Sequence, residues 1–107
     1  MKWQVLMTDT AKRDLRENAL FLYEQSGELD VATALVSALR EQCLALEAFP
    51  ERGAIPKDYV LKALGYRYLV YQHYLIFYLT DSEKHTVYIH AFFNEKQDSF
   101  QHMRKRI

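Results

Sequence analysis

The run LGYRYLVYQHYLIFYL, residues 64–79, places a permanent cation, Arg67, among five tyrosines and several aliphatic residues. Such a run is typical of the inside of a β-sheet, where an arginine desolvated without a partner costs several kcal/mol. Arg67 therefore either pairs with a carboxylate, such as that of Asp98, or lies on a face open to water and to an anion. Its planar guanidinium group suits a phosphate better than the ammonium group of a lysine would.

Four histidines could supply acid–base chemistry, because histidine titrates near neutral pH. They are His73, His85, His90 and His102. None is spaced from another, or from Cys43, in the way that metal ligands are, so we expect no metal site and no cofactor. Asp98, Ser99 and His102 are neighbours on one short segment, and the strand–turn–helix context of a nucleophile elbow is missing. The sequence therefore does not predict a hydrolase triad.

Five tyrosines could stack on nucleic-acid bases, a contact that contributes about 1–3 kcal/mol per base in single-strand binders. They are Tyr68, Tyr71, Tyr74, Tyr78 and Tyr88. Tyrosine is also a favoured strand residue, so core packing explains most of these positions. His90 lies among apolar neighbours and is interpreted as a hydrogen-bonded structural residue, and Cys43 as a small core residue.

The 107 residues are half apolar and 26% charged, with 14 basic and 14 acidic side chains, which is typical of one globular domain, here residues 1–107. The apolar stretches are too short to span a membrane. The opening residues MKWQV lack the features of a secretory signal, and the single cysteine fits a reducing cytoplasm.

Residues 1–51 hold five Lys/Arg against nine Asp/Glu, and residues 52–107 hold nine against five. This asymmetry suggests one polar face for a basic partner and another for an anion.

The first half of the chain is predicted to form a strand followed by a helical hairpin. The strand covers residues 3–7, one helix runs from a cap at Thr8 or Asp9 to Gly27, and the other from a cap at Asp30 to Pro50. Residues with helical spacing form the buried stripes. They are Ala11, Leu15, Ala19 and Leu22 in the first helix, and Ala32, Leu35, Val36, Leu39, Cys43 and Leu46 in the second.

The second half changes to an alternation of period two, which indicates strands. After a loop at 51–62 with an extended piece near Val60, strands are predicted at 66–71, 74–80 and 86–92. A polar loop then leads to a short terminal helix with Phe100, Met103 and Ile107 on one side. Tight turns make neighbouring strands antiparallel. The order β-α-α-β-β-β defines an α+β domain, with a helical hairpin packed on one face of a small, mostly antiparallel sheet and a short C-terminal helix.

The side chain of Arg67 must then lie on one of the two sheet faces. If the hairpin covers one face, the other is free. Alternation places Arg67 with Leu69 and Tyr71, opposite to Tyr66 and its set, but both sets are mostly apolar. The cost of burying a guanidinium group predicts that Arg67 faces the open side, or at least reaches a rim.

Three segments together resemble the RelE/ParE toxin superfamily, whose members are also called plasmid stabilisation proteins. They are TDTAKRDL at residues 8–15 after the first strand, LEAFPERG at 46–53, and GYRYLVY at 65–71 with the strands that follow. The likeness covers essentially the whole chain. It implies the toxin of a type II toxin–antitoxin pair, bound in a hetero-oligomer by a small cognate antitoxin. The antitoxin is expected to cover the helical hairpin or the open sheet edge.

The superfamily has two known activities, cleavage of mRNA in the ribosomal A site and poisoning of DNA gyrase. Metal-independent RNA cleavage needs a base, cations for the phosphate and an acid. By resemblance, Arg67 matches the strand arginine of the nucleases, Lys96 stands in place of their second basic residue, and His102 falls where a tyrosine or histidine transfers protons. These three are the candidate catalytic residues if the protein is a nuclease. His102 has the alternative of being an exposed side chain on the terminal helix.

Two departures favour the gyrase branch. The segment FNEKQD at 93–98 holds only one of the cations that the nucleases cluster there, and the whole chain is neutral where ribosome-directed toxins are basic. The basic tail at 104–106 is either a phosphate-binding or gyrase-directed segment or a solvated terminus. We therefore expect a gyrase-poisoning toxin in the cytoplasm. A ribosome-dependent mRNA endonuclease and a non-toxic antitoxin-binding member are the alternatives.

Overall fold

The computed structural model describes residues 2–107; Met1, which the sequence places at the start of the predicted domain, lies outside the described residues. The elements are β1 (Gln4–Met7), α1 (Asp9–Ser26), α2 (Leu29–Leu44), a 3-10 turn η1 (Ala45–Glu47), α3 (Tyr59–Ala63), β2 (Arg67–Tyr71), β3 (Tyr74–Asp81), β4 (Thr86–Asn94) and α4 (Ser99–Lys105). The predicted α+β order is confirmed, with α3 as an additional helix.

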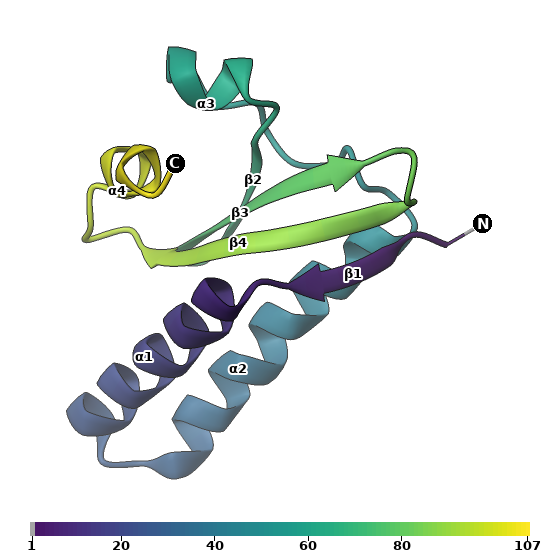
Figure 1. Ribbon diagram of the computed structural model, residues 1–107. Helices are drawn as coiled ribbons and strands as arrows, with labels where there is room; N and C mark the ends of the chain where they lie inside the picture. Colours follow the sequence, from purple (N-terminus) through teal and green to yellow (C-terminus); the bar gives the residue numbers. More distant parts are fainter. Residues whose placement is uncertain (1) are drawn as a thin grey trace.

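The four strands form one sheet in the order β1-β4-β3-β2. β2 and β3 pair antiparallel, as do β3 and β4, whereas β1 lies parallel to β4 at one edge. The sheet is therefore mostly antiparallel, as predicted. Figure 1 shows the α1–α2 hairpin on one side of the sheet and α3 and α4 on the other.

The ends of the hairpin helices follow local chemistry. Thr8 caps α1, because its Oγ1 accepts the Ala11 amide hydrogen at 3.1 Å, and Gly27 ends the helix with a φ of 70°, in the left-handed region. The prediction for α2 was wrong at both ends. Glu28 occupies the N-cap position without a side-chain cap, and the α-helix stops at Leu44 before η1. A helix can lack these caps when its buried face packs well.

Two apolar clusters lie on opposite faces of the sheet. The first joins the hairpin stripes to the sheet and includes Ala11, Leu15, Leu35, Leu39, Cys43, Leu69, Ile76 and Tyr78. The second includes Leu61, Tyr66, Phe77, Ala91, Phe93 and Met103, which come from α3, α4 and the facing side of the strands. The expectation of a free second face was therefore wrong, because α3 and α4 pack on it.

The segment around Val60 is helical where we expected an extended piece. Asp58 caps α3, since its Oδ1 accepts the amide hydrogens of Val60 and Leu61 at 3.0 and 3.1 Å. Leu61 is fully buried against the sheet. A short amphipathic turn of this kind carries too few residues for its period to show in the sequence.

A β-bulge interrupts the pairing of β3 with β4. Phe77 pairs with Ala91 and Tyr78 with Ile89, so His90 is the additional residue between them. The bulge reverses the alternation of β4. Ile89 consequently belongs to the hairpin-side cluster and Ala91 to the opposite one, although the two are only two residues apart.

Candidate functional site

Arg67 lies at the start of β2 on the hairpin side of the sheet, in register with Tyr78. Its Nη1 donates to the backbone carbonyl oxygens of Glu51 and Gly53, at 3.1 and 3.0 Å. The prediction that Arg67 lies on the sheet face away from the hairpin was therefore wrong, while the alternative that it reaches the rim of the sheet was right. The partners of Nη1 are therefore backbone carbonyls of a loop, where we expected a carboxylate or an open face.

The loop that Arg67 holds is also fixed by Tyr78. The Gly53 amide donates to the Tyr78 hydroxyl at 2.9 Å, and Ala54 pairs with Tyr68 through two backbone hydrogen bonds. Burial raises the pKa of Tyr78, and the Gly53 amide offsets part of that rise. Arg67 and Tyr78 thus join the loop after η1 to the sheet.

The other two candidate catalytic residues lie elsewhere. Lys96 is exposed in the turn after β4. His102 is exposed on α4, with its ring centroid 6.0 Å from that of Phe93. Arg67 pairs with Tyr78 of β3, and Tyr78 pairs with Ile89 of β4. Ile89 is five residues before Asn94, so Arg67 lies roughly 16 Å along the strand direction from the end of β4 that precedes Lys96. The structure does not bring the three side chains together.

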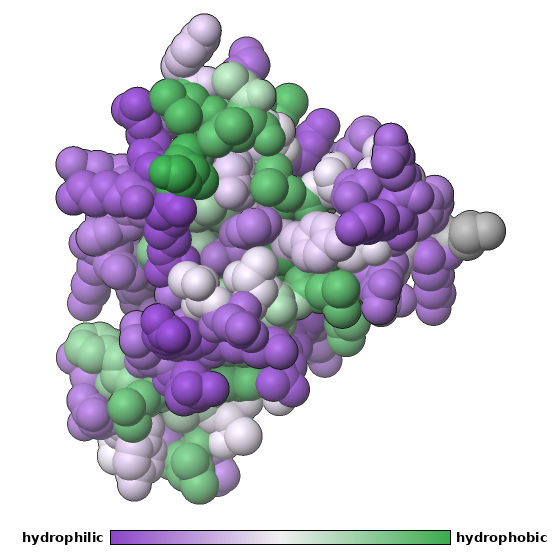
Figure 2. All heavy atoms as spheres, viewed as in Figure 1, coloured by the Kyte–Doolittle hydropathy of each residue, from purple (hydrophilic) through white to green (hydrophobic). Residues whose placement is uncertain are grey.

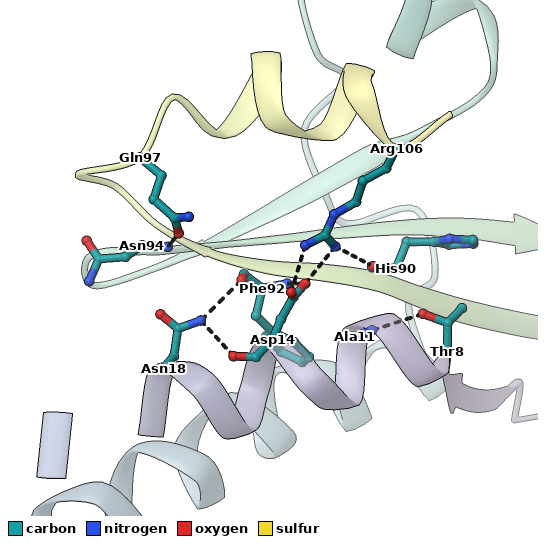
Figure 3. Close-up of polar contacts among 9 residues, drawn as sticks. All are labelled: Thr8, Ala11, Asp14, Asn18, His90, Phe92, Asn94, Gln97 and Arg106. Carbon is teal, nitrogen blue, oxygen red and sulfur yellow. Dashed lines mark hydrogen bonds and ion pairs between the residues drawn. The ribbon is translucent and has the colours of Figure 1, made fainter. Parts of the chain in front are cut away.

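An ion pair that the sequence did not predict fastens the C-terminal segment to α1 (Figure 3). Arg106, just after α4, donates through Nη1 and Nη2 to the two carboxylate oxygens of Asp14, each at 2.7 Å. The side chain of Asp14 is only 8% exposed and that of Arg106 28%. The guanidinium carbon also lies 4.6 Å from the centre of the Phe93 ring, a distance that allows a cation–π contact.

Asp14 and its neighbours complete an edge of the sheet. β1 ends at Met7, opposite Ile89, so the later backbone groups of β4 have no strand beside them on that edge. The Asp14 Oδ2 accepts the Phe92 amide hydrogen at 3.1 Å, the Asn18 amide donates to the Phe92 carbonyl at 3.2 Å, and Arg106 donates to the His90 carbonyl at 3.3 Å. Side chains therefore replace the missing strand, as Figure 3 shows.

One signal for Asp14 was present in the sequence. Position 14 lies three residues after Ala11 and one before Leu15, and therefore on the inner side of α1. An acidic residue at such a position needs a partner. Nothing in the pattern of the tail separates Arg106 from Arg104 and Lys105, so the partner itself could not be named.

A second feature is a groove of about 550 Å³ between β1, α1 and α2. We call it the cationic groove. Its floor is apolar and includes Val5, Met7, Leu15, Ala19 and Val36, and its charged lining is Lys12, Arg16 and Arg40. No acidic side chain of the described residues lines it. The predicted acidic hairpin thus carries three of its cations along one groove.

The remaining histidines do not gather into a site. Burial lowers the pKa of His90, whose ring meets that of Tyr66 edge to face at 5.6 Å, an aromatic contact where we expected hydrogen bonding. His85 stacks on Trp3 at 4.5 Å, and His73 contacts the Glu95 carboxylate at 2.7 Å. Within residues 2–107, no three His, Cys, Asp or Glu side chains are grouped so as to hold a metal ion. None of the helices in that range is long and apolar enough to cross a membrane.

Comparison with solved structures finds this fold in known toxin–antitoxin complexes. One chain of the RelBE2 toxin–antitoxin complex from Mycobacterium tuberculosis is 22% identical with a TM-score of 0.68, covering 91% of this chain and 95% of its own length. A chain of the chromosomal ParDE system of P. aeruginosa is 18% identical with a TM-score of 0.71, covering 87% and 96%. No curated protein sequence matches.

The family is given by the sequence itself. Residues 5–99 match the model of the ParE toxin of type II toxin–antitoxin systems. The matched range runs from β1 to the first residue of α4, and so includes the hairpin and the whole sheet. This chain belongs to the ParE toxin family of type II toxin–antitoxin systems.

Proposed function

We propose that this protein inhibits growth by poisoning DNA gyrase in the cytoplasm, and that a cognate antitoxin holds it inactive. The dispersal of the three nuclease candidates supports a mechanism without chemistry of the toxin's own. A nuclease must hold a base, an acid and a cation around one phosphate, within hydrogen-bonding reach of the reacting atoms. Arg67, Lys96 and His102 do not surround one such position.

The test compares the toxin with two variants at exposed positions. Lys96→Ala and His102→Ala change exposed side chains. We expect both to keep full toxicity on induction, with thymidine incorporation falling before methionine incorporation. Purified toxin should inhibit supercoiling by gyrase. An earlier fall in methionine incorporation, abolished by either variant, would support the mRNA endonuclease instead, and no fall in either would leave a non-toxic member.

The cationic groove is the surface that we assign to the antitoxin. Three cations above an apolar floor are complementary to an amphipathic segment with acidic side chains beside apolar ones. Figure 2 shows further apolar side chains near the tip of the hairpin, where Leu29 is 69% exposed. Leu29 is seven residues before Val36 of the groove, and so lies on the same side of α2. The groove and Leu29 together give the antitoxin an apolar path along the hairpin.

A charge reversal tests this assignment. Lys12→Glu/Arg16→Glu places two anions in the groove and should weaken antitoxin binding at least tenfold in a titration of purified proteins, because like charges at an interface cost several kcal/mol. Arg13→Glu is the matched control, since Arg13 is an exposed residue of the same helix that does not line the groove. Equal effects of the two changes would place the antitoxin elsewhere.

A further inference from the structure

The sheet separates the charges of this protein into two layers. The hairpin segment, residues 9–44, carries four Lys/Arg against seven Asp/Glu. The segments that form and flank α3 and α4, residues 57–64 and 96–107, carry six Lys/Arg against two Asp/Glu. Because these layers lie on opposite faces of the sheet (Figure 1), the imbalance along the sequence becomes a charge difference across the molecule.

Three exposed lysines of α3, α4 and the segment before α3 form a surface that we call the basic face: Lys57, Lys62 and Lys105. α3 and α4 contact each other, and Arg104 Nε lies 3.5 Å from Asp58 Oδ2 at the start of α3. Leu61 and Met103 point into the same buried cluster. The exposed positions of both helices therefore turn outward together, and Figure 2 shows strongly hydrophilic side chains over α4 beside apolar ones over α3.

Two acidic side chains lie near this surface, and each has partners of its own. Asp58 is occupied as the cap of α3 and as the partner of Arg104, and Asp98 caps α4 through the Gln101 amide at 3.3 Å. Arg104 and Arg106 each pair with a carboxylate, that of Asp58 and that of Asp14, and neither belongs to the basic face. Lys57, Lys62 and Lys105 are exposed and are not among the ion pairs of the described residues.

We propose that the basic face binds the phosphate backbone of duplex DNA, and that during poisoning this duplex is the segment that gyrase holds. The second part rests on the function proposed above. Lysine and arginine on rigid helices contact phosphates without reading bases, which suits a duplex of any sequence. Tyr59, the first residue of α3, is 84% exposed beside these lysines.

Single-stranded RNA fits the face less well. Its recognition relies on aromatic side chains on which successive bases stack. On this side of the sheet, Tyr68 meets the Phe100 ring of α4 edge to face at 5.3 Å. The α4 helix therefore covers this sheet tyrosine, and Tyr59 has no exposed sheet ring beside it to continue a stack of bases.

The test uses the full-length toxin, a labelled duplex of random sequence and a single-stranded RNA of equal length, with binding followed by fluorescence anisotropy against salt. Each phosphate contact adds about −0.9 to the slope of log K against log salt, and about eightfold in affinity at 0.1 M salt. Lys57→Gln/Lys62→Gln/Lys105→Gln should reduce the slope by about 2.7 and the affinity about 500-fold if each lysine contacts one phosphate. Arg13→Gln/Lys84→Gln removes exposed cations from α1 and from the β3–β4 turn, and should change the affinity less than threefold.

Supercoiling inhibition by the same variants completes the test. We expect the triple variant to need a concentration at least tenfold higher, and the control to match the unmodified toxin. An equal duplex affinity of the triple variant and the unmodified toxin would overturn the DNA contact. A higher affinity of the unmodified toxin for the RNA than for the duplex would also overturn it. Loss of DNA binding with unchanged inhibition would overturn its part in poisoning. Failure of the unmodified toxin to inhibit gyrase would refute the proposed target, and this readout is separate from the binding measurement.

Discussion

Removing the carboxylate of Asp14 should have a large effect on stability, because this buried group has three hydrogen-bonding partners. Asp14→Ala breaks both bonds to Arg106 and leaves the Phe92 amide of β4 without its acceptor. Asp14→Asn removes the charge but keeps one oxygen that can accept from Phe92. Comparison of the two variants separates the cost of the unpaired charge from that of the unpaired amide.

The structure sets the expected sizes. Removing one partner of a buried ion pair costs about 3–5 kcal/mol, and an unsatisfied buried amide about 1–3 kcal/mol. Arg106 keeps 28% of its side chain exposed, so water recovers much of its solvation. We therefore expect a loss in the free energy of unfolding of about 3 kcal/mol for Asp14→Ala and about 1.5 kcal/mol for Asp14→Asn. For a chain of this size, the larger loss lowers Tm by about 15 °C.

Urea unfolding of the single variants, of Arg106→Ala and of the double variant Asp14→Ala/Arg106→Ala gives the coupling energy between the two side chains. Arg104→Ala is the matched control in α4, because its pair with Asp58 is longer, at 3.5 Å, and its side chain is 52% exposed. We expect it to cost less than about 1 kcal/mol. Additivity of the Asp14 and Arg106 changes within about 0.5 kcal/mol would refute the role of this ion pair.

Three further predictions concern groups that are at least partly buried. Gly53→Ala should destabilise the fold by about 2–4 kcal/mol in urea unfolding, because its Cβ would lie 2.5 Å from the Tyr78 hydroxyl. Gly27→Ala is the control: its Cβ meets only open space, and the φ of 70° alone should cost about 1 kcal/mol. Burial holds the pKa of folded His90 below its ordinary 6.5. The contribution of neutral His90 to stability is therefore full above pH 6.5 and is lost as the pH falls through the folded pKa. In urea unfolding, His90→Gln should flatten the dependence of the free energy of unfolding on pH in this range. Burial raises the pKa of Cys43 to about 12, so iodoacetamide should alkylate it at pH 8 only after unfolding; alkylation of the folded protein would show that α2 opens.

The sequence predicted the elements whose residues repeat over several turns or strand positions. The helical stripe from Ala11 to Leu15 and the alternation of β2 depend on many residues at once, and Thr8 and Gly27 act through local backbone geometry. Such signals survive in a single sequence. The α3 helix has only five residues, too few for a period, and its formation depends on the cap from Asp58 and the burial of Leu61.

The position of Arg67 could not be predicted, because its partners are neither charged side chains nor solvent. Backbone carbonyls of Glu51 and Gly53 satisfy it, and a loop backbone leaves no mark in the pattern of residue types. The Asp14–Arg106 pair was missed for a related reason. Its partners are 92 residues apart, and the residue types of the tail do not show that Arg104 and Arg106 pair with different carboxylates.

The completion of the β4 edge by α1 and the tail has a consequence for the order of folding. β1 and α1 are made early, but β1 pairs in the sheet with residues 86–89, and Asp14 with Arg106. Closing a loop of this length costs about 4 kcal/mol of chain entropy. The α1–α2 hairpin, whose contacts are local, can form first, with Asp14 and the sheet-facing stripe still in water. A nascent chain therefore cannot gain this contact until Arg106 has been synthesised, and a chain released short of residue 106 would carry a loosened edge.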